Sequence, residues 1–331
     1  MSDGGPIGVL GAGAWGTALA NMLASDGRDV RLWARSADLA ETINRERRNE
    51  HYLPDAELHE TITATGDIAA MSECCALLVV TPAQHMGSVL TQMPSFPRDL
   101  VLCSKGIEAA TGRMMNEVAR AAAPDSAIAV LSGPTFAHEV AAGLPTAITL
   151  ACSGGEEQWD RLAPAIARST FRPYYSDDVI GAEVAGAVKN VLAIACGVVN
   201  GLALGQNARA SLIARGYAEM LRFGEAVGAS RETLAGLCGM GDLVLTCTST
   251  ASRNFALGKA LGEGQSLGEV MHGRRTVAEG AHTAPILAQL AQEKGISMPI
   301  VRAVVALLGG KEPRDIVAQL LARPLTSEAA L

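Results

Sequence analysis

Three glycines near the start of the chain have the spacing of a phosphate-binding turn. Gly11, Gly13 and Gly16 form the pattern G-x-G-x-x-G, after a short apolar strand at residues 7–10 and before a helical segment at residues 17–25. In this pattern the first glycine permits a tight turn, the second lets a pyrophosphate approach the backbone, and the third lets the helix pack on the strand. The N-terminus of the helix presents free N–H groups to the phosphates. The pattern favours a dinucleotide site over a glycine turn that only packs.

A cation follows the second predicted strand, at residues 29–33. A strict NAD site would place Asp or Glu about 20 residues beyond the glycines, where the carboxylate binds the adenosine ribose. Here the segment from Trp33 to Ser36 contains Arg35 and no carboxylate. An arginine at this place tolerates or favours a 2′-phosphate, although an ordinary surface arginine would give the same pattern. We therefore expect NADP or NAD as the cofactor and leave the preference between them open.

One lysine lies in a long apolar segment. Lys189 is the only formally charged residue between Glu183 and Arg209. Its neighbours at helical spacing are all small: Ala182, Ala185, Gly186, Ala193 and Cys196. Burial among such residues lowers the pKa of an ammonium group toward the range useful for proton transfer. Lys189 is therefore a candidate acid that would donate a proton to a ketone oxygen as hydride arrives. The alternative is a surface lysine whose stem alone is buried.

Two further segments place polar groups directly after predicted strands. Lys105 follows the strand at residues 100–103, and ligands of open α/β sheets bind outside the carboxyl ends of the strands. The turn at residues 132–135, Ser-Gly-Pro-Thr, follows another strand. Its N–H groups and hydroxyl groups would either bind a ligand or cap the next helix.

Two charged residues flank an apolar run later in the chain. Asp242 is a lone carboxylate before this run, which suggests a fixed electrostatic partner for a cation, with Lys189 as the candidate. Arg253 follows the run, and its guanidinium fork suits a pair of phosphate oxygens. Taken alone, each residue is more often an ordinary helix cap or surface charge.

The elements that must position these residues change type near residue 180. Short apolar strands alternate with helical segments in the first part, at residues 7–10, 29–33, 76–80, 100–103, 128–131 and 147–150. This alternation predicts an α/β fold with a Rossmann-type, doubly wound parallel sheet over residues 1–180. Helical patterns dominate afterwards, at residues 182–204, 210–227, 283–293 and 300–308. Residues 181–331 are therefore expected to form an all-α, substrate-binding domain.

The composition is that of a folded protein of about two domains. The chain has 331 residues, of which 49% are hydrophobic and 18% charged, and its net charge is −7. This composition excludes intrinsic disorder. The acidic balance, with no basic run, argues against a nucleic-acid partner, but a small anionic substrate needs only a few placed cations.

Cysteine and histidine usage points to a reducing compartment without a metal centre. The seven cysteines form no C-x-x-C pair, and the six histidines form no H-E-x-x-H motif. We expect a cytoplasmic protein with no disulfide framework and no metal site. The apolar stretch at residues 7–25 lacks a preceding basic region, and the one at residues 191–205 is interrupted by Asn200. We therefore expect neither an export signal nor a membrane span.

Taken together, six segments between about residues 7 and 310 resemble bacterial NAD(P)-dependent glycerol-3-phosphate dehydrogenase. They are GAGAWGTALA, CSKGIE, SGPTFAHEVAAGLPTAI, GAVKNVLAI, GMGDLVLTCTSTASRN and TVAEG. The resemblance implies a Rossmann domain joined to a helical domain similar to that of 6-phosphogluconate dehydrogenase. It also implies reversible interconversion of dihydroxyacetone phosphate and sn-glycerol 3-phosphate, which feeds phospholipid synthesis in the cytoplasm, and it suggests a homodimer.

The resemblance also assigns roles to individual residues. Lys189 would accept a proton during oxidation and donate one during reduction. The implied substrate-site residues are Lys105, Gly133, Thr135, Lys189, Asp242, Ser252, Arg253 and Asn254. With the three glycines of the turn included, the implied cofactor-site residues are Gly11, Gly13, Ala14, Trp15, Gly16, Arg35, Lys105, Ala137, Arg253, Val277 and Glu279.

Two other functions stay compatible with the pattern. One is a dehydrogenase of the same architecture that acts on a 3-hydroxyacid or on 6-phosphogluconate, against which the substrate loops argue. The other is a redox-sensing module that binds the dinucleotide without catalysis. Such a module would need neither a buried lysine nor clustered cations.

Overall fold

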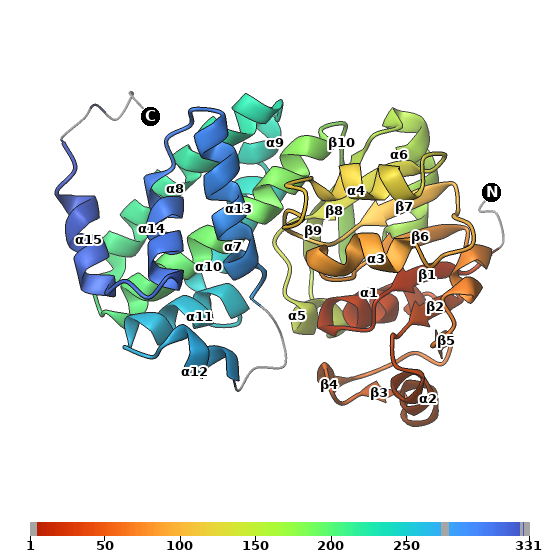
Figure 1. The fold of residues 1–331 in the computed structure, drawn as a ribbon. Helices are drawn as coiled ribbons and strands as arrows, with labels where there is room; N and C mark the ends of the chain where they lie inside the picture. Colours follow the sequence, from red (N-terminus) through yellow and green to blue (C-terminus); the bar gives the residue numbers. More distant parts are fainter. Residues whose placement is uncertain (1–4, 273–277, 325–326, 328–331) are drawn as a thin grey trace. The chain divides into compact units, whose positions relative to one another are not determined.

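The computed structural model describes residues 5–272, 278–324 and 327 of the chain. The chain divides into two compact units. Residues 1–104 and 114–179 form the first unit, and residues 105–113 and 180–331 form the second. Figure 1 shows the strands of the first unit in the red to yellow-green part of the chain and the helices of the second in green to blue.

The first unit is built on an eight-stranded sheet of the order β10-β9-β8-β7-β6-β1-β2-β5. Its strands are β1 (Ile7–Leu10), β2 (Val30–Trp33), β5 (Ile62–Thr65), β6 (Ala76–Val79), β7 (Asp99–Leu102), β8 (Ala127–Ser132), β9 (Thr146–Cys152) and β10 (Phe171–Ser176). The six strands from β5 to β8 in this order are parallel. Every residue of β1, β6 and β7 is buried, as continuous apolar runs covered on both faces require. The predicted Rossmann-type sheet is confirmed.

One strand runs against the predicted direction. Strand β9 pairs with β8 in antiparallel fashion, and β10 is parallel to β9. A parallel return needs a long crossover, usually a helix that packs on the sheet. The connection from β8 to β9 carries only the five-residue helix α5 (Ala137–Ala141), which packs against α1 (Ala14–Ala24) instead. An apolar run does not encode its own direction, so the sequence could not reveal this reversal.

The remaining elements of this unit are helices and one separate ribbon. Besides α1 and α5, the helices are α2 (Ala37–Glu46), α3 (Met86–Leu90), α4 (Met115–Ala122) and α6 (Gly155–Ile166), with short 3₁₀ segments at η1 (Ala69–Glu73) and η2 (Ala83–His85). Between α2 and β5, the strands β3 (Arg48–Asn49) and β4 (Leu53–Glu57) form an antiparallel ribbon outside the main sheet. This ribbon lies next to α1.

Residues 105–113 of the second unit form a loop, whereas its described residues after 179 form helices with short connections, as predicted. Its elements are α7 (Val179–Gly201), α8 (Gly205–Val227), α9 (Arg231–Ala235), η3 (Leu237–Gly241), α10 (Asp242–Thr248), α11 (Arg253–Gly262), α12 (Leu267–His272), α13 (Glu279–Glu293), α14 (Pro299–Leu308) and α15 (Pro313–Leu321). Two glycines set a close helix crossing. A Cβ on Gly197 of α7 would lie 2.1 Å from the Phe255 carbonyl oxygen, and one on Gly258 of α11 would lie 1.9 Å from that of Ile194. The two helices therefore meet backbone to backbone.

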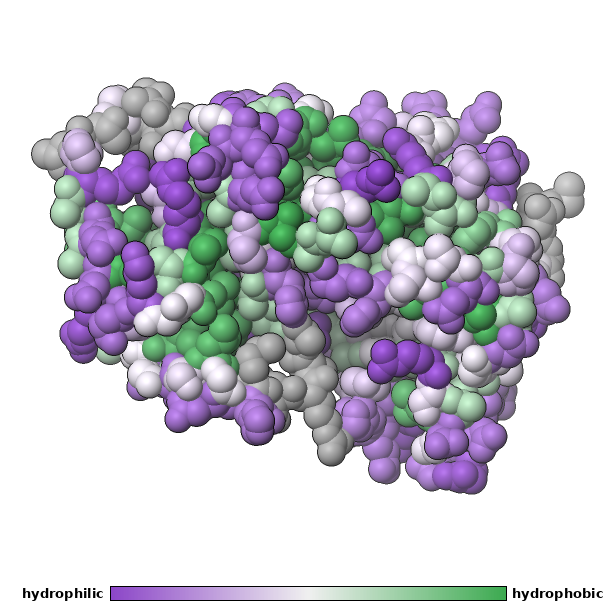
Figure 2. Space-filling view, viewed as in Figure 1, coloured by the Kyte–Doolittle hydropathy of each residue, from purple (hydrophilic) through white to green (hydrophobic). Residues whose placement is uncertain are grey.

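Helix α7 is long and apolar enough to cross a membrane, with a mean hydropathy of 1.6 over its most apolar window. The bent pair at residues 231–248 and 253–262 passes the same test when taken together. However, 94% of the α7 window is buried inside the protein, which makes α7 a core helix, as the sequence predicted. Figure 2 shows polar residues over most of the visible face, with smaller apolar areas between them.

Candidate active site

The glycine turn between β1 and α1 contains two glycines that the fold requires and one that it does not. Gly11 has a φ of +129°, and a Cβ on Gly16 would lie 1.8 Å from the Gly11 carbonyl oxygen. Gly13, in contrast, has φ −73° and ψ −179°, which any residue adopts, and a Cβ there would meet no atom within 4 Å. Neither strain nor packing explains Gly13. The open space beside it fits the approach of a pyrophosphate to the backbone.

The N-terminus of α1 is equally suited to an anion. Gly13 is the residue before the helix, so no side chain caps it, and the first turn contains no acidic residue. The first helical residues, Ala14, Trp15 and Gly16, therefore keep backbone N–H groups that have no partner within the helix. Such N–H groups, together with the helix dipole, attract phosphate. The predicted Ala137 is the first residue of α5, which packs against this helix.

Two other predicted positions lie in the first unit. Arg35 is exposed at the end of β2, just before Ser36, which caps α2 by accepting a hydrogen bond from the Leu39 N–H. Gly133 follows β8, and a Cβ there would lie 3.0 Å from the Ile148 Cα. This glycine is therefore needed where β9 comes close. The Thr135 hydroxyl donates to the Gly133 carbonyl at 3.3 Å, which stabilises the turn.

In the second unit, one carboxylate holds two lysines. The Nζ of Lys189 lies 2.7 Å from Oδ1 of Asp242, and the Nζ of Lys105 lies 2.7 Å from Oδ2. Lys189 also donates to the Thr246 hydroxyl at 2.9 Å, and that hydroxyl donates to Asp242 Oδ1 at 3.2 Å. Lys189 is 6% exposed and Asp242 is fully buried. The predicted pairing of Lys189 with Asp242 is confirmed, and a surface position for Lys189 is excluded.

Local structure explains how these residues meet. Asp242 is the first residue of α10, where the helix dipole stabilises a negative charge, and Thr246 lies one turn further on the same face. Lys189 lies near the middle of α7. Gly186, one turn earlier, makes room for the stem of Lys105, because a Cβ on Gly186 would lie 3.2 Å from the Lys105 Cγ. Part of the small face predicted around Lys189 therefore receives a second lysine.

The electrostatics of this cluster tune Lys189 for proton transfer. Burial lowers the pKa of Lys189 to about 8; Asp242 opposes this effect and the nearby Lys105 adds to it. Burial alone would raise the pKa of Asp242, but Lys105 and Lys189 outweigh it, so this pKa lies below its ordinary value. Asp242 therefore stays a carboxylate, while Lys189 can gain or lose a proton near neutral pH.

A second network lies one residue away from Lys189. The Asn254 amide donates to the Asn190 side-chain oxygen at 3.0 Å and accepts from the Gly280 N–H at 2.9 Å. The predicted Ser252 caps α11, where its hydroxyl accepts from the Phe255 N–H at 3.3 Å. Through these bonds the start of α11 is tied to α7 and to the start of α13.

Of the remaining predicted positions, Arg253 is exposed and forms no ion pair with any residue that the structure describes. Glu279, the first residue of α13, is half-buried. Val277 lies outside the described residues. The structure adds Thr246 and Asn190, which the sequence reasoning missed. Thr246 could have been found by its four-residue spacing from Asp242 on one helix, and Asn190 by its position directly after Lys189.

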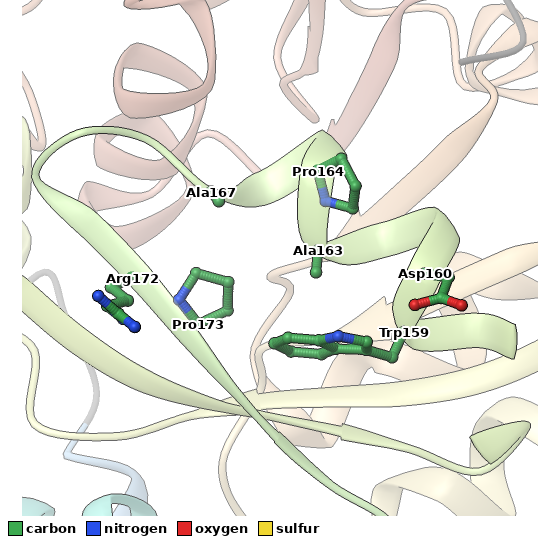
Figure 3. A pocket seen from close by; sticks show the side chains of 7 residues that line it. All are labelled: Trp159, Asp160, Ala163, Pro164, Ala167, Arg172 and Pro173. Atoms are coloured by element: carbon green, nitrogen blue, oxygen red, sulfur yellow. The ribbon is translucent and has the colours of Figure 1, made fainter. Parts of the chain in front are cut away.

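A cavity of about 350 Å³ in the first unit is a separate feature. It lies between α6 and β10, with Trp159 facing Ala163 and two prolines, and with Asp160 and Arg172 at opposite ends (Figure 3). Four strands separate β10 from β1 in the sheet, and none of the predicted site residues lines the cavity. It is therefore not part of the candidate site.

The Rossmann sheet, the open glycine turn and the buried lysine in a helical unit define the class of dinucleotide-dependent dehydrogenases. Comparison with family models makes this specific. Residues 6–158 match the N-terminus and residues 178–318 the C-terminus of NAD-dependent glycerol-3-phosphate dehydrogenase. The chain belongs to this family, and the resemblance predicted from its motifs is confirmed.

Individual relatives agree with the family assignment. The chain is 69% identical over 322 residues to a glycerol-3-phosphate dehydrogenase (NAD(P)+) of Erythrobacter litoralis, covering 97% of both chains. It is 69% identical over 326 residues to one of Novosphingobium aromaticivorans, covering 98% of both. A crystal structure of glycerol-3-phosphate dehydrogenase from Coxiella burnetii superposes with a TM-score of 0.91 at 40% identity, over 96% of this chain and 99% of that one.

Proposed function

We propose that this chain catalyses the reversible reduction of dihydroxyacetone phosphate to sn-glycerol 3-phosphate with NADPH or NADH. The observation that carries the proposal is the buried Lys189–Asp242–Lys105 cluster in a chain of this family. A module that only senses dinucleotides would have no use for two lysines around one buried carboxylate, since burying such charges is costly.

Lys189 supplies the proton of the reduction. When bound, the nicotinamide supplies a hydride to C2 of the ketone, and the oxygen on C2 then takes a proton from the Lys189 ammonium. Asp242 and Thr246 fix the direction of this ammonium. Asp242 has both oxygens occupied by lysines and is fully buried, so it acts on the substrate through those lysines. In the oxidation direction neutral Lys189 accepts the proton.

The remaining substrate residues bind the phosphate and align the ketone. Arg253, at the start of α11, is exposed and forms no ion pair with any described residue, and its guanidinium fork suits two phosphate oxygens. Lys105 adds a second positive charge. The other substrate-site residues of this proposal are Gly133, Thr135, Ser252 and Asn254. Alignment of the two reactants removes several kcal/mol from the barrier.

The cofactor site combines the glycine turn with flanking residues. Its proposed members are Gly11, Gly13, Ala14, Trp15, Gly16, Arg35, Lys105, Ala137, Arg253, Val277 and Glu279. Arg35, exposed after β2, would oppose a 2′-phosphate, which permits NADP without excluding NAD. We assign nucleotide binding to residues 1–180 and substrate binding to residues 181–331. The enzyme would act as a cytoplasmic homodimer in phospholipid synthesis.

The direct test is a substrate panel with both cofactors. We expect NADPH and NADH oxidation to depend on dihydroxyacetone phosphate, with little or no activity on 6-phosphogluconate or 3-hydroxyacids in the reverse direction. Tight NADPH binding without any ketone-dependent oxidation would instead support a sensing module. Preference for an unphosphorylated substrate would support a different dehydrogenase.

A further inference from the structure

Asn49 is a fully buried amide that touches the glycine turn from outside the motif. It belongs to β3, in the ribbon between α2 and β5. Its Nδ2 donates to the Ala12 carbonyl at 2.9 Å and to the Thr17 hydroxyl at 2.8 Å. Its Oδ1 accepts from the Tyr52 N–H at 3.3 Å. Both hydrogens of the amide are therefore used, and its orientation is determined by its partners.

The Ala12 carbonyl, which Asn49 binds, accepts none of the backbone hydrogen bonds of helix α1. The first backbone bond of α1 runs from the Thr17 N–H to the Gly13 carbonyl at 2.9 Å, one residue after Ala12. Among the described residues, the Ala12 carbonyl receives, apart from the Asn49 bond, only a long hydrogen bond of 3.4 Å from the Thr17 hydroxyl. Since Ala12 is buried, its carbonyl depends on Asn49 for its principal hydrogen bond.

Holding this carbonyl fixes the next N–H. In a trans peptide the C=O of one residue and the N–H of the next point in opposite directions. No cis peptide bond occurs in the described chain, so fixing the Ala12 carbonyl toward Asn49 turns the Gly13 N–H away from it. Gly13 is the glycine with open space beside it. Asn49 thus sets the peptide plane at the point where a pyrophosphate would approach.

We propose that Asn49 is a positioning residue for dinucleotide binding: its side-chain amide holds the Ala12 carbonyl and so keeps the glycine turn in the shape that receives the pyrophosphate. This inference rests on the proposal that the glycine turn binds the cofactor. The pyrophosphate is common to NADPH and NADH, so loss of the Asn49 amide should weaken the binding of both cofactors equally. Arg35, in contrast, distinguishes the two cofactors by the 2′-phosphate.

The test uses two substitutions at Asn49 and the same two at a matched position. Asn49→Asp keeps the size and the Tyr52 contact but sets a carboxylate oxygen against the Ala12 carbonyl, and Asn49→Leu removes the donors without adding charge. The matched residue is Asn21, a buried amide on α1 that donates to the Glu57 carbonyl at 3.1 Å and accepts from the His59 N–H at 3.0 Å. It makes equivalent backbone bonds away from the turn.

For each variant, the Kd of NADPH and of NADH, the KM of dihydroxyacetone phosphate, kcat and the unfolding temperature are measured. We expect both Asn49 variants to raise both cofactor Kd values about tenfold or more, with the KM of the ketone and kcat at saturating NADPH little changed. The Asn21 variants should lose comparable thermal stability and keep both Kd values. If the Asn49 variants lose stability but keep both Kd values, Asn49 is structural only and the inference is wrong.

Three further variants keep the result decisive. Asn49→Ala removes the amide donors without adding bulk or charge, so it tests the same link to the Ala12 carbonyl if the Asp and Leu variants do not fold. Thr17→Val is its companion, because it removes only the second partner of the amide and leaves the bond to Ala12, so its NADPH Kd should stay near the wild-type value. An unchanged NADPH Kd in Asn49→Ala would overturn the inference. Gly13→Val tests the underlying cofactor site itself. If Gly13→Val binds NADPH normally, the proposed cofactor site is wrong; if it alone loses binding, only the role of Asn49 is wrong.

Discussion

The glycine turn of the first unit and the lysine cluster of the second would recognise their proposed ligands by different means. The turn offers backbone N–H groups; its shape requires Gly11 and Gly16, and Gly13 leaves open space beside it. The cluster offers the charges of Lys189 and Lys105, which lie 53 and 137 residues before Asp242 in the sequence and both bind its carboxylate. Substitutions that enlarge a glycine should therefore impair the turn, whereas substitutions that remove a charged group should impair the cluster. Substitutions at the two places should fail in different ways.

Loss of the Lys189 ammonium should have the largest effect. Lys189→Met keeps a long apolar side chain but removes the proton donor, so kcat should fall by about 10²- to 10⁴-fold, as expected for a general acid. The NADPH Kd should stay nearly unchanged, because the glycine turn is untouched. Steady-state kinetics and NADPH fluorescence titration measure the two quantities. The control is Lys259→Met, at a half-buried lysine of α11 that pairs with Glu263, which should keep wild-type kcat. Normal turnover of Lys189→Met would rule out its catalytic role.

Removal of the shared carboxylate should come next. Asp242→Asn leaves two lysines without their counterion in a buried place, which should destabilise the protein by about 3 kcal/mol or more. In the variant that remains folded, the pKa of Lys189 should fall further, because Asp242 is the group that raises it. The pH profile of ketone reduction would therefore move to lower pH. Denaturant unfolding and the pH dependence of kcat measure both effects. An unshifted profile would show that Asp242 does not tune Lys189.

Within the glycine turn, two substitutions should separate binding from folding. Gly16→Ala places a methyl group against the Gly11 carbonyl, so it should cost about 2 kcal/mol or more in unfolding free energy. Gly13→Ala meets no neighbour and needs no unusual backbone, so the fold should keep its stability while the NADPH Kd rises about tenfold. Thermal unfolding and cofactor titration of both variants test this contrast. Equal loss of stability in both would mean that Gly13 has a packing role.

A buried carboxylate away from both sites should affect stability alone and leave catalysis and cofactor binding unchanged. Glu219 accepts hydrogen bonds from the Ile300 and Val301 N–H groups, and burial raises its pKa to about 7. The folded state therefore binds a proton more tightly than the unfolded chain, so stability should rise as the pH falls from above 7 toward 4.5. The difference is about 3 kcal/mol at most. Glu219→Gln should remove this pH dependence from the unfolding free energy. If Glu219→Gln keeps the wild-type slope of unfolding free energy against pH, another group causes the pH dependence.

The sequence predicted the turn and the sheet better than the cluster. The strands β1, β6 and β7 are buried on both faces, so their continuous apolar runs were unambiguous. Strand β10 was missed because it contains Pro173, which is tolerated there because β10 is the edge strand of the sheet. The reversal of β9 depends on where α5 packs, which no local pattern encodes.

In the cluster, the sequence predicted the buried lysine but only part of its surroundings. The absence of other charges around Lys189 indicated burial, and the lone Asp242 beside an apolar run indicated a counterion. That Lys105 shares this carboxylate depends on the tertiary fold, because 137 residues separate the two. Asn49 went unnoticed for the same reason, since it meets Ala12 across 37 residues.

The pH dependence of ketone reduction tests the central claim most directly. If Lys189 is the proton donor, kcat for reduction of dihydroxyacetone phosphate should fall as the pH rises through about 8, and kcat for oxidation of sn-glycerol 3-phosphate should rise through the same value. In Lys189→Met, the residual kcat for reduction should no longer fall as the pH rises through about 8. A limb near pH 8 that persists in Lys189→Met would contradict the account.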